Sequence, residues 1–257
     1  MFLDNEIDAI NYILTGLNHY NVMLYNGNSF SKKIFRYVKN LDKFTENNGH
    51  DDLPPDFYSD EFSCMFDVMR INDSEIKKTY NPVKIRERKA EKDIKESGIL
   101  DGMNPNVNIF INSESDNDKE HTLKNSNKNC NRVMSEHIEK IGIWKSEHPD
   151  IKHKGLLIFD ETECYFEGYV KRAYADQYVF MWDASKPLVL HKPWMDLSFV
   201  KNAYDSELDF IIWFCPYKSH GSLWQQTHYD YPDLVILDTR FPRIDYIQYD
   251  ISKFERM

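Results

Sequence analysis

Short apolar runs that lead into acidic residues constrain this chain more than any other feature of its sequence. Leu156–Phe159 runs into Asp160, Leu234–Leu237 runs into Asp238, and a third run spans Asp209–Phe214. Apolar runs this short, bounded by turn residues, are typical of strands buried in an α/β sheet. Functional groups of open α/β sheets lie beyond the carboxyl ends of the strands. We therefore expect a site where these strands end.

The composition sets the size of the fold and removes several enzyme classes. A chain of 257 residues, 41% of them hydrophobic, is long enough for one large domain or for a core domain with a smaller lobe. Only 9 residues are glycine, and the sequence contains no G-x-x-x-x-G-K-S/T, G-x-G-x-x-G or G-x-S-x-G pattern. P-loop NTPases, Rossmann dehydrogenases and typical α/β-hydrolases are therefore disfavoured.

Charge and cysteine usage indicate where the protein works and what it binds. The formal net charge is −10, so the strongly basic footprint of most nucleic-acid binders is absent overall, although a local basic surface remains compatible with it. The same charge predicts little affinity for anionic membranes, and no apolar stretch is long enough to span one. The cysteines form no C-x-x-C pair, which predicts free thiols in a reducing cytoplasm: Cys64, Cys130, Cys164 and Cys215.

The hydrophobic periodicity predicts an α/β or α+β fold with a mixed central sheet flanked by helices and a helical N-terminal lobe. The polar stretch 112–129 is the expected linker between a mainly helical lobe, 1–111, and a sheet domain, 130–257. The expected helices cover residues 4–24, 29–41, 61–71, 83–97, 132–145 and 195–204. The expected strands cover residues 106–111, 155–159, 164–170, 177–182, 209–215, 234–238 and 245–249.

The strongest candidate for chemistry is the acidic segment after the strand 155–159. Asp160, Glu161 and Glu163 place three carboxylates within four residues, and carboxylate oxygens are the ligands that Mg²⁺ and Mn²⁺ prefer. Alternate residues of an extended chain face the same side, so Glu161 and Glu163 would point together. The alternative is that a buried strand reaches solvent here and its turn is simply acidic.

Lys218, just beyond the strand 209–215, is the candidate basic residue. In extended geometry Asp209 and Lys218 lie at opposite ends of that strand, about 30 Å apart, so they cannot share a site. Lys218 would instead meet Asp160 or Asp238 if the strands 155–159 and 209–215 were parallel neighbours. The alternative is an ordinary surface lysine.

Pro232-Asp233 followed by Asp238-Thr239-Arg240 resembles the signature of restriction-endonuclease-like nucleases, Pro-Asp followed by Asp/Glu-x-Lys. In that family a helix carrying a Glu precedes the strands that carry the signature, and Glu136 in the helix 132–145 is similar in position. The resemblance covers residues 130–257 at most. It departs from the family because Asp233 and Asp238 are unusually close and Arg240 stands where Lys is expected.

The resemblance implies a metal-dependent nuclease-like phosphodiesterase, of a kind used in conflict between bacteria and phages. Asp160 and Glu163 would hold Mg²⁺ or Mn²⁺ with Asp238 as a third ligand, and Glu136 would contribute from the helix. Lys218 would act beside the metal, and Arg240 would bind phosphate. The partner implied is a nucleic acid. Stretches such as 157–162 and 213–218 also resemble uncharacterised proteins of AT-rich bacteria and their phages.

A protein of a different class fits the same sequence. An immunity-like or antitoxin-like binder, or an accessory subunit, needs no catalytic motif and would engage a basic protein partner through an acidic, aromatic-rich surface. Independently of either function, the segment 67–73, with Asp67, Arg70 and Asp73, is expected either to line a cleft between the N-terminal lobe and the sheet domain or to form an internal ion pair that holds the two together.

Overall fold

A mixed seven-stranded sheet organises the part of the chain that the structure, a computed structural model, describes. That part comprises residues 6–25, 27–47, 55–71, 89, 92–93, 96, 122–162, 164–167, 169–174, 177–182, 189–216, 218, 231–241 and 245–256. The predicted α/β or α+β class with a mixed central sheet is confirmed. No helix among these residues has the length and apolar character needed to cross a membrane.

Three parallel strands, β4, β5 and β10, form the centre of the large sheet. β11 then runs antiparallel to β10, and β1 pairs with β11 in parallel. Antiparallel β3 and β2 complete the other side. The order across the sheet is β1 (Val22–Leu24), β11 (Leu234–Asp238), β10 (Phe210–Phe214), β5 (His153–Asp160), β4 (Cys64–Ile71), β3 (Phe57–Ser59) and β2 (Thr45–Glu46).

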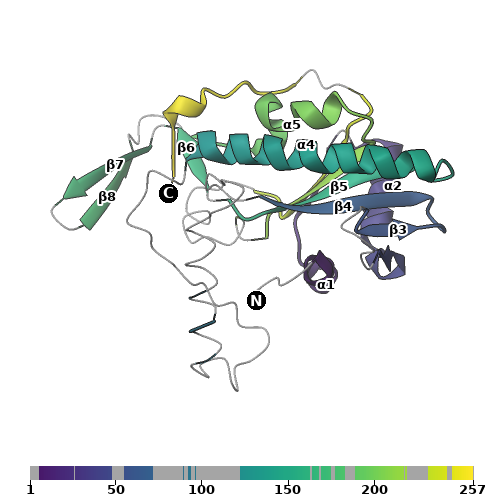
Figure 1. Ribbon diagram of the computed structural model, residues 1–257. Coiled ribbons are helices and arrows are strands. Elements are labelled where there is room, and N and C mark those ends of the chain that lie inside the picture. The colour runs from purple at the N-terminus through teal and green to yellow at the C-terminus, as the bar shows by residue number, and fades with distance from the viewer. Residues whose placement is uncertain are drawn as a thin grey trace.

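The remaining strands form two small sheets beside the large one. β12 (Phe254–Arg256), β6 (Tyr165–Glu167) and β9 (Val189–Leu190) make a three-stranded sheet. β7 (Tyr169–Tyr174) and β8 (Gln177–Trp182) pair as a hairpin that projects away from the rest of the fold (Figure 1). Single-turn 3-10 helices precede β2, α5 and β12: η1 (Leu41–Lys43), η2 (Pro193–Met195) and η3 (Ile251–Lys253).

Helices cover both faces of the large sheet. α4 (Leu123–Glu147) and α5 (Leu197–Tyr204) lie together on one face, with α1 (Glu6–Gly16) beyond the other (Figure 1). α4 connects β4 to β5 and α5 connects β5 to β10, so both crossovers move the same way across the sheet. Right-handed crossovers of this kind place their helices on the same face. α2 (Ser29–Val38) packs with α1 into the opposite core.

The central strands are buried on both faces, which explains their nearly continuous apolar sequence. Along β5, Leu156 and Ile158 point into the core under α4 and α5, while Leu157 and Phe159 point into the core under α1 and α2. β10 and β11 alternate in the same way. A side chain's position along a strand therefore fixes which of the two cores it enters.

Several sequence-based expectations are corrected by the structure. The segment 61–71, expected as a helix, contains β4, because a strand buried on both faces shows no period-2 alternation. The segment 123–129, expected in the linker, is the first part of α4, which Thr122 caps by accepting a hydrogen bond from Asn125 N at 3.1 Å. The segment 245–249 makes only an isolated bridge, between Asp196 and Ile247.

The N-terminal part of the chain contributes strands to the large sheet. β1 to β4 come from the stretch expected to be a mainly helical lobe, 1–111, and they lie in the same sheet as β5, β10 and β11. The N-terminal stretch therefore supplies four of the strands as well as α1 and α2. The expected strand 106–111 and most of the expected helix 83–97 lie outside the described residues.

Gly155 provides a test of the packing between β5 and β10. A Cβ at Gly155 would lie 2.2 Å from the Phe210 ring, and Phe210 is its register partner on β10. We expect Gly155→Ala to lower the free energy of unfolding by about 1–3 kcal/mol, because both residues are enclosed by the core. Gly142→Ala is the matched control. Nothing lies within 4 Å of its Cβ position in α4, so it should stabilise by up to about 1 kcal/mol. Urea unfolding measures both, and equal effects would contradict this packing.

Candidate functional site

The acid after β5 lies inside the protein. Asp160 is the last residue of β5 and is fully buried. The register between β5 and β10 pairs Phe159 with Phe214, so the chain beyond β10 passes directly beside Asp160. Counting along β5 places the Asp160 side chain on the same face as Leu156 and Ile158, under α4 and α5.

Hydrogen-bond donors surround the Asp160 carboxylate. Oδ1 accepts from the backbone N and the Oγ1 of Thr162, at 2.9 and 2.7 Å. Oδ2 accepts from Trp213 Nε1 at 2.8 Å, from Lys218 Nζ at 3.0 Å and from Cys215 Sγ at 3.6 Å. A carboxylate offers about four lone-pair directions, so protein groups already fill its accepting capacity.

Lys218 is the counter-charge of this buried carboxylate. Its side chain is 5% exposed, and its Nζ also donates to Thr162 Oγ1 at 2.7 Å. Burial by itself would lower the pKa of Lys218, but Asp160, with smaller contributions from Cys215 and Cys164, raises it above the ordinary value. The strands 155–159 and 209–215 are parallel neighbours, which is the condition under which Lys218 could meet Asp160 or Asp238, and it meets Asp160. The alternative of a surface lysine is wrong.

The groups around this ion pair are held in their neutral forms. Burial, followed by the charge of Asp160, raises the pKa of the Cys215 thiol well above its ordinary value. Burial also raises the pKa of Tyr231, whose ring lies 5.7 Å from Lys218 Nζ. The cluster therefore contains one fixed positive charge and one fixed negative charge in a setting that excludes water.

The expected Mg²⁺ or Mn²⁺ site does not fit these residues. A cation would have to displace the donors on Asp160, and Lys218 would then face it as a like charge at close range. Among the residues with described positions, no group of three or more His, Cys, Asp and Glu side chains is placed to hold a metal ion. Glu163 lies outside those residues. The Asp160 cluster is suited to fixing the ends of β5 and β10.

Asp238, the expected third ligand, is far from Asp160. It pairs with Phe210 at the start of β10, five residues from the level of Asp160, which corresponds to about 17 Å along the strands. It also faces the other core, since it hydrogen-bonds Asn28 Nδ2 at 2.8 Å beside α2. Asp160 and Asp238 therefore cannot share one cation, because β10 and β11 run antiparallel.

Asp238 instead orients Arg240. Arg240 Nε donates to Oδ1 and a terminal guanidinium nitrogen donates to Oδ2, both at 2.8 Å, in a two-pronged ion pair. Burial would raise the pKa of Asp238, but the hydrogen bonds from Arg240 and Asn28 lower it. The Arg240 guanidinium also stacks 3.4 Å from the centre of the Phe30 ring in α2. Arg240, expected to bind phosphate, is therefore a held, partly exposed arginine on the side of the fold away from Asp160.

The other expected residues are placed apart from both clusters. Glu136 pairs with Arg132 one turn back in α4 at 3.0 Å, with its side chain 43% exposed, whereas Asp160 is sealed from solvent. Arg70 pairs with Glu161 at 2.5 Å rather than with Asp67. Asp73 lies outside the described residues.

A pair of acids beside a histidine, buried Asp67 and half-buried Asp56, was not anticipated from the sequence. Asp67 in β4 accepts from the Asp56 backbone N at 3.1 Å and from His137 Nδ1 in α4. Burial, followed by the Asp67 charge, raises the pKa of Asp56 to about 8. The two acids are eleven residues apart across the β3–β4 hairpin, and their contact follows from strand pairing, which the helix expected at 61–71 concealed.

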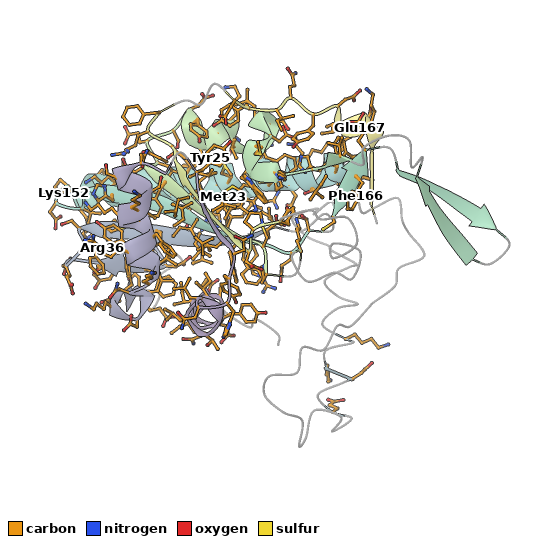
Figure 2. The ribbon with its side chains drawn as sticks, turned by 180° about the vertical axis from the view of Figure 1, so that it is seen from behind. Met23, Tyr25, Arg36, Lys152, Phe166 and Glu167 are labelled. Carbon is orange, nitrogen blue, oxygen red and sulfur yellow. The ribbon has the colours of Figure 1, made fainter. Side chains whose placement is uncertain are left out.

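The outer side of α2 carries a concentration of positive charge in an otherwise acidic chain. Between Ser29 and Leu41 there are four basic residues and no acidic one, and these four are exposed while Phe30, Ile34 and Tyr37 face the core. Figure 2 places Arg36 and Lys152 on the same side of the molecule as α2. We call this surface the basic face, and it comprises Lys32, Lys33, Arg36, Lys39, Lys152 and Arg240.

Local electrostatics show that part of the basic face converges on His153. Lys33 Nζ donates to His153 Nε2 at 2.8 Å. Burial, and then the charge of Lys33, lowers the pKa of His153, with Arg240 and Lys152 acting in the same direction and Asp209 opposing them. Within the described chain, no carboxylate forms an ion pair with Lys32, Arg36 or Lys39. In the sequence these cations are the polar side of a predicted helix. The sequence does not reveal that Lys152, His153 and Arg240 lie beside them.

Comparison with known proteins adds no assignment to this geometry. No protein-family model, no curated protein and no solved structure matches the chain.

The buried ion pair can be tested by removing its positive partner. Lys218→Met leaves Asp160 charged without its counter-ion, so we expect a loss of about 3–5 kcal/mol in the free energy of unfolding. Asp160→Asn should also destabilise, and the double variant should cost less than the sum of the two. Urea unfolding of the four proteins gives the coupling. Lys140→Met, at an exposed position of α4, is the control. A cost below about 1 kcal/mol for Lys218→Met would contradict this role.

The Asp56–Asp67 contact predicts a dependence of stability on pH. Because the native pKa of Asp56 is about 8 and the unfolded value about 4, the native state holds one more proton between these limits. Through this group, stability falls as pH rises from about 4 to 8, by at most about 1.4 kcal/mol per pH unit. Asp56→Asn cannot ionise and should lose this component. Unfolding free energies from pH 5 to 8.5 measure it, with exposed Asp60→Asn as the control. Parallel pH profiles for wild type and Asp56→Asn would rule it out.

Proposed function

We propose that this protein binds nucleic acid and that the basic face contacts the phosphate backbone. The observation that carries the proposal is the run of exposed cations on α2, which have no acidic residue among them and continue into Lys152 and Arg240. Lysine and arginine contacts to phosphate supply most of the affinity of non-specific nucleic-acid binding, because each contact releases condensed counter-ions.

The dimensions of the basic face suit a polyanion. A helix of ten residues is about 15 Å long, which corresponds to four or five nucleotides at 3.4 Å of rise per nucleotide. Residues spaced by three and four, such as Lys32, Arg36 and Lys39, are neighbours on one side of a helix. They can therefore contact successive phosphates of one strand.

The overall charge limits the orientation of the partner. With a net charge of −10, most of the surface repels a polyanion, so binding would be confined to the basic face and would weaken steeply with salt. An acidic protein can therefore have a nucleic-acid partner, because the attraction depends on the local electrostatic field at the basic face and not on the net charge of the chain.

Two other functions receive less support. The metal-dependent nuclease suggested by the resemblance needs Asp160 and Asp238 together, and they occupy opposite faces and opposite ends of the strands. A binder of a basic protein would use the acidic remainder of the surface, and it leaves the exposed cations on α2 without a role.

The proposal predicts that binding depends on α2. In the triple variant Lys32→Gln, Arg36→Gln, Lys39→Gln, we expect affinity for a fluorescently labelled 20-nucleotide oligomer to fall at least about tenfold near 0.1 M salt. The slope of log K against log salt should flatten by about 2–3, because three phosphate contacts are removed. Fluorescence anisotropy over a salt series measures both quantities.

A variant with the same charge change on the other side of the sheet is the control. Lys124→Gln, Lys140→Gln, Lys201→Gln removes three exposed cations from α4 and α5. It should leave the salt slope unchanged and weaken binding only slightly. Equal loss in both triple variants, or equal binding to polyglutamate or to phosphatidylserine vesicles, would overturn the proposal, since each result indicates a general charge effect.

A further inference from the structure

The basic face ends in an exposed aromatic residue. Phe241 follows Arg240 directly, and its ring centre lies 5.5 Å from the Arg240 guanidinium. At 63% exposure, it is the most exposed large apolar side chain among the described residues. An aromatic face beside a row of cations is the arrangement by which single-stranded nucleic acids are held, with phosphates on the cations and a base on the ring.

Resting on the proposed function, we infer that Phe241 and Arg240 bind an unpaired base and that the partner is therefore single-stranded nucleic acid. A base in a duplex is already stacked on both sides and presents only its edge in a groove. A base in a single strand offers its π-face to any aromatic ring, whatever its identity. We therefore expect a preference for single strands over duplexes, with no preference for a particular base sequence.

The arginine of this platform is fixed before any ligand arrives. Asp238, itself 2% exposed, holds two guanidinium nitrogens, and Phe30 lies against one guanidinium face at 3.4 Å. Asn28 connects the platform to α2, because its Nδ2 donates to Asp238 while its Oδ1 accepts from Ser31 N at 2.7 Å as the helix cap. A side chain held in this way loses little rotamer entropy on binding.

The platform is also continuous with the backbone contact. Arg240 contacts Phe30 in the first turn of α2, from which Lys33 and Arg36 follow along the exposed side of the same helix. A strand whose phosphates follow α2 therefore reaches Phe241 at one end of its path. Phe241 contributes no charge, so its share of the affinity should be independent of salt.

Oligonucleotide binding tests the inference directly. Wild-type protein should bind a single-stranded dT20 oligomer more tightly than the matched dA20·dT20 duplex. Phe241→Ala should weaken dT20 binding by about 5- to 100-fold, because base–aromatic stacking contributes to this extent, and should leave duplex binding within about twofold. Phe241→Trp should bind dT20 at least as tightly as wild type. None of these changes should alter the salt slope.

The control and the outcomes separate this inference from the proposed function. Ile143→Ala, at an exposed position of α4 on the other side of the sheet, should leave both affinities unchanged. If Phe241→Ala binds dT20 as well as wild type while the triple variant of α2 does not, the single-strand inference is wrong and the proposed function stands. If the triple variant binds as wild type does, the proposed function itself is wrong, and the inference fails with it.

Discussion

The fold depends on a charge that cannot reach water. An ionised carboxylate is expensive to bury, and Asp160 is tolerated only because every accepting direction has a donor. Those donors come from three places: the turn after β5, the strand β10 and the loop residue Lys218. Satisfying one carboxylate thus fixes β10 beside β5 and returns the following chain across their ends. Apolar packing alone would specify this arrangement less sharply, since alternative registers also bury apolar surface.

The same sheet separates two electrostatic settings. On the side of α4 and α5, the sheet buries a paired charge, Asp160 with Lys218. On the side of α1 and α2, positive charge is external, and Lys32, Arg36 and Lys39 form no ion pair with a described carboxylate. The antiparallel pairing of β10 with β11 carries Asp238 to the opposite ends of the strands, and its position along β11 directs it to the opposite core. Two acids that look equivalent in sequence, each ending an apolar run, therefore serve unrelated purposes.

The elements that the sequence predicts correctly are those with a local signal. The strands near 155–159, 209–215 and 234–238 are short apolar runs between turn residues, and the helix near 132–145 has regular apolar spacing. The segment of β4 does not look like a strand in the sequence, because burial on both faces removes alternation. Phe62 before the strand and Met65, Phe66 and Met69 within it imitate helical spacing. At the site, the meeting of Asp160 with Lys218 was conditional on strand order. That order is a non-local property, set by which strands pair, and no spacing within one segment encodes it.

Arg240 and Asp238, paired in the resemblance to a nuclease signature, are also paired in the fold, but as an ion pair. The pair Asp238 and Arg240 resembles a metal ligand with a phosphate-binding neighbour. In the fold both carboxylate oxygens of Asp238 accept hydrogen bonds from the guanidinium, so the ion pair as a whole carries no net charge and the guanidinium is held in one orientation. Such a group attracts a phosphate less strongly than a free arginine does, but it presents a fixed planar surface beside Phe241. If the proposed function is correct, contact at this end of the basic face would be by stacking, while Lys32, Arg36 and Lys39 would supply the long-range attraction.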